Sequence, residues 1–84
     1  MNLQIVIDNK LEEFTGKLSK MTYEKLPVGR KPILISNNCF QLFSKEWVSA
    51  LILIDESIIE DGPILYLHQS VKDLIYPNNE FITL

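Results

Sequence analysis

The residues best suited to chemistry in this 84-residue chain are its single cysteine, Cys39, and its single histidine, His68. A thiolate beside an imidazole can act as a nucleophile, and both side chains bind metals. A structural metal site needs about four ligands, and a Cys-His pair needs a third group to orient it. We therefore interpret Cys39 as a small buried strand residue and His68 as a polar residue at a strand end. We expect no enzyme activity, no metal and no cofactor.

Carboxylates gather in one segment, where Asp55, Glu56, Glu60 and Asp61 lie within seven residues. Paired carboxylates can hydrolyse glycosides, but only across a cleft that holds the sugar between them, and so short a chain has little material for one. The segment is then either a solvated acidic turn or a patch that faces a partner. We predict the patch, whose contact residues would be Asp55, Glu56, Ser57, Glu60, Asp61, Tyr66 and His68.

The net charge of −3 is unevenly distributed along the chain. Residues 1–31 hold six basic and four acidic groups, whereas residues 32–84 hold two basic and seven acidic groups. A nucleic-acid binder needs a broad basic face, and this chain offers only Lys25, Arg30 and Lys31. We therefore expect a protein partner and no direct contact with nucleic acid.

Length and hydropathy predict one small domain over residues 1–84. The longest apolar run, residues 50–54, has the length of a strand and is far shorter than the roughly 20 residues that span a bilayer. The first residues lack the basic region of a signal peptide, and a lone cysteine suits a reducing compartment. We expect a cytoplasmic protein without a membrane partner.

The first twenty residues allow two secondary structures. Leu3, Ile5 and Ile7 alternate as in a strand, whereas Leu3, Ile7, Leu11, Phe14 and Leu18 lie at helical spacings. Asp8 is a good N-cap, and Lys17 and Lys20 would complement the dipole at the C-terminal end of a helix. We predict a helix over Asp8–Lys20, weakened by Gly16, and leave residues 3–7 open between helix and strand.

The rest of the chain predicts short strands separated by turns. Pro27, Gly29 and Pro32 indicate a loop over residues 22–32, and Asn37-Asn38 a tight turn. The predicted strands are 33–35, Cys39–Phe43, Trp47–Ile54, Ile64–Leu67 and Phe81–Leu84, with turns at 44–46 and 78–79. A short helix over Gln69–Tyr76 would point Val71, Leu74 and Ile75 inward, and Pro77 would end it.

Consecutive strands with short turns pair antiparallel, because a parallel crossover needs a dozen or more residues. The expected fold is therefore α+β. It comprises an antiparallel sheet of four to five strands with one N-terminal helix and one short C-terminal helix packed on it.

Residues 40–74 resemble the C-terminal half of the staphylococcal-type uracil-DNA glycosylase inhibitors. The matching pieces are Phe40-x-Leu42-Phe43, Ala50, Ile54-Asp55-Glu56, Leu65-Tyr66-Leu67-His68 and Leu74. Members of that family are small acidic proteins of phages or mobile elements that mimic DNA, with carboxylates in place of phosphates and an apolar pocket. Their Glu-Ser pair lies in the N-terminal half, whereas here Glu56-Ser57 lies in the acidic segment.

The resemblance implies a non-catalytic inhibitor of a nucleic-acid enzyme, with uracil-DNA glycosylase the first target. Its apolar pocket would lie between the sheet and the helices, near Phe14, Leu74 and Ile75. Two alternatives remain open: another anti-defence protein, such as an anti-CRISPR, and a small structural, assembly or antitoxin-like module that associates through a sheet edge.

Overall fold

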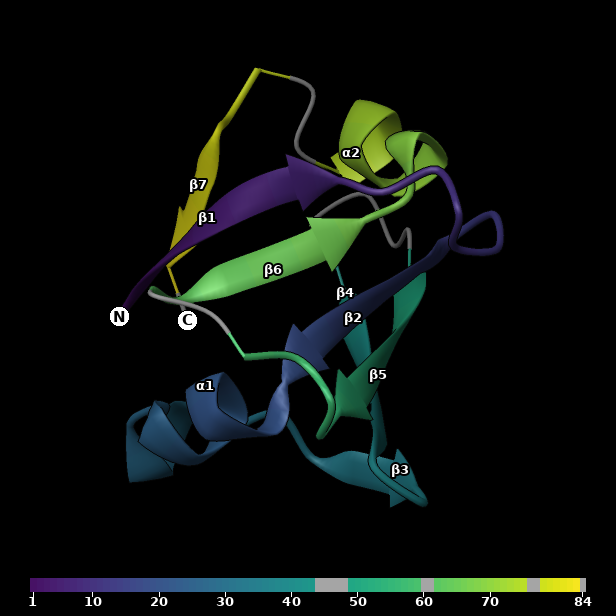
Figure 1. Cartoon of the computed structure of the whole chain (residues 1–84). Helices are drawn as coiled ribbons and strands as arrows, with labels where there is room; N and C mark the ends of the chain where they lie inside the picture. The colour runs from purple at the N-terminus through teal and green to yellow at the C-terminus, as the bar shows by residue number, and fades with distance from the viewer. Residues whose placement is uncertain (44–48, 60–61, 76–77, 84) are drawn as a thin grey trace.

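The computed structural model describes residues 1–43, 49–59, 62–75 and 78–83, and shows one seven-stranded sheet with two short helices (Figure 1). The α+β class is confirmed. The order of the strands is β3-β4-β5-β2-β6-β1-β7. The strands are β1 (Asn2–Ile7), β2 (Thr15–Ser19), β3 (Leu34–Ser36), β4 (Cys39–Phe43), β5 (Ser49–Asp55), β6 (Ile64–Leu67) and β7 (Phe81–Thr83). The two helices are α1 (Lys20–Lys25) and α2 (Gln69–Ile75), and a 3₁₀ turn, η1 (Val28–Arg30), follows α1.

The sheet is mixed and larger than the antiparallel sheet of four to five strands that the sequence predicted. Strand β1 pairs in parallel with β6, and β2 pairs in parallel with β5, while the other neighbours are antiparallel. The turn-length argument holds for consecutive strands such as β3, β4 and β5. It fails for β2 and β5 because α1 and η1 lie between them in the chain, which gives enough length for a crossover.

The predicted helix over Asp8–Lys20 is wrong, and the alternating pattern prevails in residues 3–7. Leu3 and Ile5 are buried while Asn2 and Gln4 are exposed, as a strand with one covered face requires. Asp8 does not start a helix: its Oδ1 accepts the Lys10 backbone N–H at 3.0 Å, which closes a turn.

A second turn in the same loop confirms that no helix forms before β2. The Thr15 backbone N–H donates to the Glu12 carbonyl at 3.3 Å, and Phe14 has a φ of 60°. A helix cannot continue through a left-handed residue. The chain therefore enters β2 at Thr15, where Gly16 and Lys17 become strand residues.

Gly16 lies where β5 and β6 approach β2 closely. A Cβ at this position would lie 2.6 Å from the Tyr66 carbonyl oxygen of β6 and 2.8 Å from Ile52 Cδ1 of β5. A glycine in a strand often marks such a close approach. The residue that would have weakened a helix is therefore what lets β2 lie between β5 and β6.

The two helices cover one face of the sheet and close the core. Ser19 caps α1, because its Oγ accepts the Thr22 backbone N–H at 3.0 Å. Leu26 follows α1 and is buried, as is Val71 of α2. The buried cluster comprises Leu3, Ile5, Leu18, Leu26, Phe40, Leu42, Ala50, Ile52, Ile54, Leu65, Leu67, Val71 and Ile82. Among the described residues, no helix has the length and apolar character needed to cross a bilayer.

Most predictions for residues 37–84 are confirmed. The turn at Asn37 and Asn38 has positive φ at both residues, and strands β4 and β6 have the predicted bounds. Strand β5 matches the predicted Trp47–Ile54 strand from Ser49 onward, and α2 matches the predicted helix through Ile75. Trp47, the turn at 44–46, Tyr76, Pro77 and Leu84 lie outside the described residues.

Three further predictions need correction. The loop predicted over 22–32 contains most of α1 and all of η1, because Ser19 supplies an N-cap that the proline-based argument overlooked. The strand predicted at 33–35 lies one residue later, at β3. Leu74 is half exposed instead of buried, since α2 turns Val71 toward the core.

Replacing Gly16 with Ala tests the close approach. We expect the free energy of unfolding to fall by about 1–3 kcal/mol, because the new methyl group must displace the backbone of β6. Chemical denaturation measures this. Gly29→Ala is the matched control, because a Cβ at Gly29 meets nothing within 4 Å. Equal stabilities of the two variants would contradict the packing described for β2.

Candidate functional site

The face of the sheet opposite the helices exposes a continuous set of side chains that we call the open face: Val6, Lys17, Leu51, Leu53 and Tyr66. The register places Lys17 between Leu53 of β5 and Tyr66 of β6, and Tyr66 beside Val6 of β1. Leu51 lies two residues before Leu53, on the same side of β5. The long apolar run at residues 50–54 thus buries only alternate residues, and Leu51 and Leu53 are 39% and 48% exposed.

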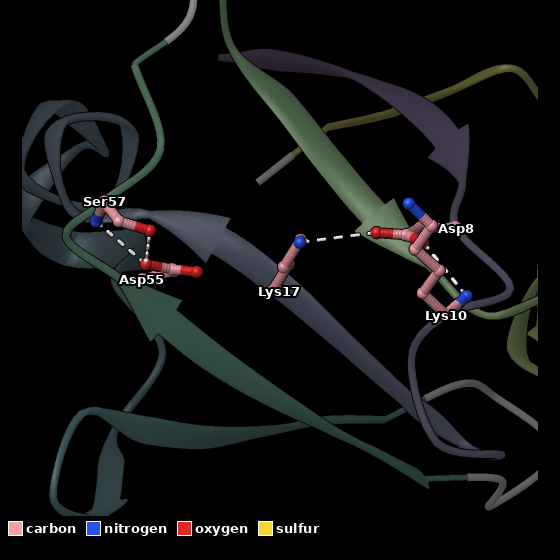
Figure 2. A network of polar contacts seen from close by, with 5 residues as sticks. All are labelled: Asp8, Lys10, Lys17, Asp55 and Ser57. Atoms are coloured by element: carbon pink, nitrogen blue, oxygen red, sulfur yellow. Dashed lines mark hydrogen bonds and ion pairs between the residues drawn. The ribbon is translucent and has the colours of Figure 1, made fainter.

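Lys17 is the polar centre of the open face. Its Nζ lies 3.3 Å from Asp8 Oδ2 and 5.4 Å from the centroid of the Tyr66 ring. Figure 2 shows the Lys17 side chain directed toward Asp8, with Asp55 lying beyond its other side. Ion pairing and the cation–π contact together fix a cation in the middle of an otherwise apolar row.

Asp8 is held in place from two sides. Its Oδ1 accepts the Lys10 backbone N–H, and its Oδ2 faces Lys17 (Figure 2). The hydrogen bond from Lys10 and the nearby Lys17 ammonium lower the pKa of the Asp8 carboxyl below its ordinary 3.8. Asp8 therefore stays ionised, and Lys17 keeps its partner, across the neutral range.

The described part of the acidic turn is tied to the protein itself. Asp55 ends β5, and its Oδ1 accepts hydrogen bonds from Ser57 N–H at 2.8 Å and Ser57 Oγ at 2.6 Å. Glu56 is exposed, and its Oε1 forms an ion pair with Lys20 Nζ at 3.1 Å. The hydrogen bond to Glu56 raises the pKa of Lys20. Of the predicted contact residues, Asp55, Glu56 and Ser57 thus lie together, while Glu60 and Asp61 lie outside the described residues.

His68 caps the helix that follows it. Its Nδ1 accepts the Ser70 backbone N–H at 3.1 Å and lies 2.8 Å from Ser70 Oγ. Because Nδ1 is an acceptor here, the Ser70 hydroxyl must donate its proton to the ring. Ser70 Oγ in turn accepts the Phe14 backbone N–H at 2.9 Å. His68 therefore joins the start of α2 to the left-handed turn before β2. Its position at a strand end agrees with the sequence-based interpretation.

Cys39 and His68 do not meet. Cys39 lies on β4 and His68 follows β6, and strands β5 and β2 lie between them. Three strand spacings amount to about 14 Å, too far for a nucleophile and its base. Cys39 is buried, as predicted, and burial raises the pKa of its thiol. Among the residues that the structure describes, no three His, Cys, Asp or Glu side chains gather as a metal site would require.

A pocket of about 620 Å³ adjoins the open face at the β6–β1–β7 end of the sheet. Among the predicted contact residues that the structure describes, Tyr66 alone lines it. Phe14, Leu74 and Ile75, near which a pocket was expected, are not part of its described lining. The lining consists of Asn2, Gln4, Ile59, Gly62, Pro63, Ile64, Tyr66 and Phe81.

Of the open face, sequence reasoning singled out only Tyr66, and it did not include Val6, Lys17, Leu51 and Leu53. Lys17 was assigned to the end of a helix, where a basic residue needs no further explanation. Leu51 and Leu53 lie in an apolar run, which is typical of a strand buried on both faces. A lysine at the middle of a strand would have been the informative signal, once β2 was known to be a strand.

Comparisons with family models, with curated proteins and with solved structures found no significant match to the chain.

Removing the Ser57 hydroxyl tests the Asp55 turn. The hydrogen bonds from Ser57 are the main cause that lowers the pKa of Asp55 below 3.8. In Ser57→Ala we expect this pKa to rise toward 3.8, measured by NMR titration of the carboxyl carbon. Ser49→Ala, an exposed serine on the same strand, is the control and should leave the pKa of Asp55 unchanged.

The same substitution has a predictable effect on stability against pH. A carboxyl whose pKa is lowered in the folded state stabilises the fold above its unfolded pKa and loses that contribution as pH falls through the folded value. The difference in stability between wild type and Ser57→Ala should therefore be full near neutral pH and shrink below about pH 4. If the difference in the free energy of unfolding between the two proteins grew in acid, Ser57 would not act through the Asp55 carboxylate.

Substituting His68 separates capping from other roles. His68→Ala should lower the free energy of unfolding by about 1 kcal/mol, because the Ser70 N–H loses its acceptor. His68→Asn keeps a side-chain acceptor at the cap and should retain most of that stability. Urea denaturation compares the two, and equal losses for Ala and Asn would contradict the capping interpretation.

Proposed function

We propose that this chain is a non-catalytic protein-binding module that uses the open face as its contact surface. The observation that carries the proposal is the pair of exposed leucines, Leu51 and Leu53, beside the Lys17–Tyr66 contact. Contiguous exposed apolar side chains with a polar border are typical of interaction sites. Tyr66 suits this use, because an aromatic ring with a polar tip gains contact area at a small cost in side-chain entropy.

The polar centre would give the interaction its specificity. Asp8 and Tyr66 hold the Lys17 ammonium in one position before any partner arrives, so little of its side-chain freedom remains to be lost on binding. A partner must then offer an acceptor or an aromatic ring at that position, or leave a charge buried without full compensation. The apolar row contributes affinity, and Lys17 discriminates between partners.

Within this class, we propose a nucleic-acid enzyme as the partner and uracil-DNA glycosylase as the first target. The proposal rests on the resemblance of residues 40–74 and on Glu56, whose carboxylate is exposed beside the sheet. A groove that binds phosphates is basic, so carboxylates steer association toward it. Glu56 is paired with Lys20, but that ion pair is exposed, and a partner could replace Lys20 at a small cost.

A uracil-excision assay on a labelled oligonucleotide tests the target. At low salt, where exposed charges act most strongly, excision should stop as the protein reaches an equimolar ratio. Glu56→Lys should weaken inhibition by about tenfold or more. Glu13→Lys, which makes the same charge change on the exposed loop before β2, should not. Undiminished excision in the presence of excess protein would exclude uracil-DNA glycosylase as the target. The open face would then bind a different protein.

The open face itself has a separate test that needs no candidate partner. Wild type, Leu53→Ser and Leu74→Ser are immobilised and used to capture proteins from a bacterial lysate. Leu53 and Leu74 are equally exposed, at 48% and 50%, but Leu74 lies on α2, away from the open face. We expect Leu53→Ser to lose the captured protein and Leu74→Ser to keep it. Retention by both variants, with their fold confirmed by circular dichroism, would contradict the proposed surface.

A further inference from the structure

Strand β3 forms one edge of the sheet and exposes aliphatic side chains on both of its sides. All three of its residues are exposed, including Leu34 and Ile35, and the preceding Ile33 is 86% exposed. Within the described chain, β3 has β4 as its only neighbouring strand. Figure 1 shows β3 at the end of the molecule away from α2. An edge strand of this kind offers unpaired backbone groups together with apolar side chains.

The sequence gives this edge none of the charges that usually protect it. Of the 19 charged residues in the chain, none lies within residues 32–44, whereas the opposite edge strand β7 follows Glu80 directly. Charged side chains on an edge strand normally discourage pairing with another chain. The shortness of β3 and the irregular register between Leu34 and Ser36 limit the pairing that remains possible.

We propose that β3 pairs with β3 of a second copy, antiparallel and about a two-fold axis, so that two sheets join into one. The direction follows from charge. In an antiparallel pair, Lys31 before one strand lies near Asn37 and Asn38 after the other, whereas a parallel pair would bring Lys31 beside its own copy. A strand that is uncharged along its length meets no repulsion from itself in the antiparallel arrangement. Such an interface is isologous and closes as a dimer.

The side chains on the two faces suit the same arrangement. Leu34 pairs with Phe40, which pairs with Ile52, so Leu34 continues the buried face of the sheet. By alternation Ile33 and Ile35 continue the opposite face, beyond β4. Pairing two copies therefore places aliphatic residues beside aliphatic residues on both faces at once. Because three residues give a small interface, the dimer should be weak and depend on protein concentration.

Sedimentation velocity over a wide range of protein concentration tests the proposal on the full chain. Wild type should shift from monomer to dimer as concentration rises, and the β3 amides should exchange more slowly with solvent in the dimer. Ile33→Lys should abolish the shift, because it places a charge at the paired edge without touching the core. Val28→Lys is the matched control: Val28 is 91% exposed and lies on η1 instead of β3, so this variant should still dimerise.

Three results would overturn the inference. If wild type stayed monomeric at every concentration, β3 would not pair with its own copy, and its edge would be open to an extended segment of another protein. A dimer that survives Ile33→Lys would have to form elsewhere. A dimer that Leu53→Lys disrupts as strongly as Ile33→Lys would place the contact between open faces. The proposed partner-binding function does not depend on any of these results, because the capture comparison at Leu53 and Leu74 does not involve β3.

Discussion

The structure depends on how closely β2 packs between β5 and β6, and Gly16 is the residue that permits it. Strand β2 is the link between two groups of strands, β3-β4-β5 on one side and β6-β1-β7 on the other. Any Cβ at Gly16 would collide with the backbone carbonyl of Tyr66. The lack of a side chain at Gly16 therefore lets β2 join the two groups in one sheet. The buried cluster lies beneath this joined sheet.

The same packing determines what the opposite face presents. With Gly16 and Leu18 directed to the core, Lys17 must point away from it. The register then places Lys17 beside Tyr66 and Leu53, and the turn at Asp8 supplies the carboxylate that pairs with it. Because both helices pack on the core side, the apolar residues on this face stay exposed. That uncovered surface is why we favour a binding function, and the acidic turn lies at its border through Asp55.

Local signals were sufficient where neighbours in sequence are also neighbours in space. The hairpin at Asn37 and Asn38, strand β6 and helix α2 are of this kind. The N-terminal region was not decided by such signals, since the spacing of Leu3, Ile7 and Leu18 suits both a helix and a strand. What decided it was the Asp8 side chain closing a turn and Phe14 adopting a left-handed conformation, and hydrophobic periodicity indicates neither. The mixed topology could not be predicted because β1 and β6 lie far apart in the sequence.

The candidate site was predictable only in part, for the same reason. Tyr66 and the Asp55–Ser57 turn were identified from residue type and local clustering, whereas Lys17 could be recognised only once its strand was known. Methyl NMR of the protein titrated with its captured partner tests the open face most directly. The account predicts that the methyl resonances of Leu51 and Leu53 shift or broaden while those of Val71 and Leu74 stay unchanged. Perturbations confined to Leu74 and Val28, with Leu51 and Leu53 unaffected, would contradict it.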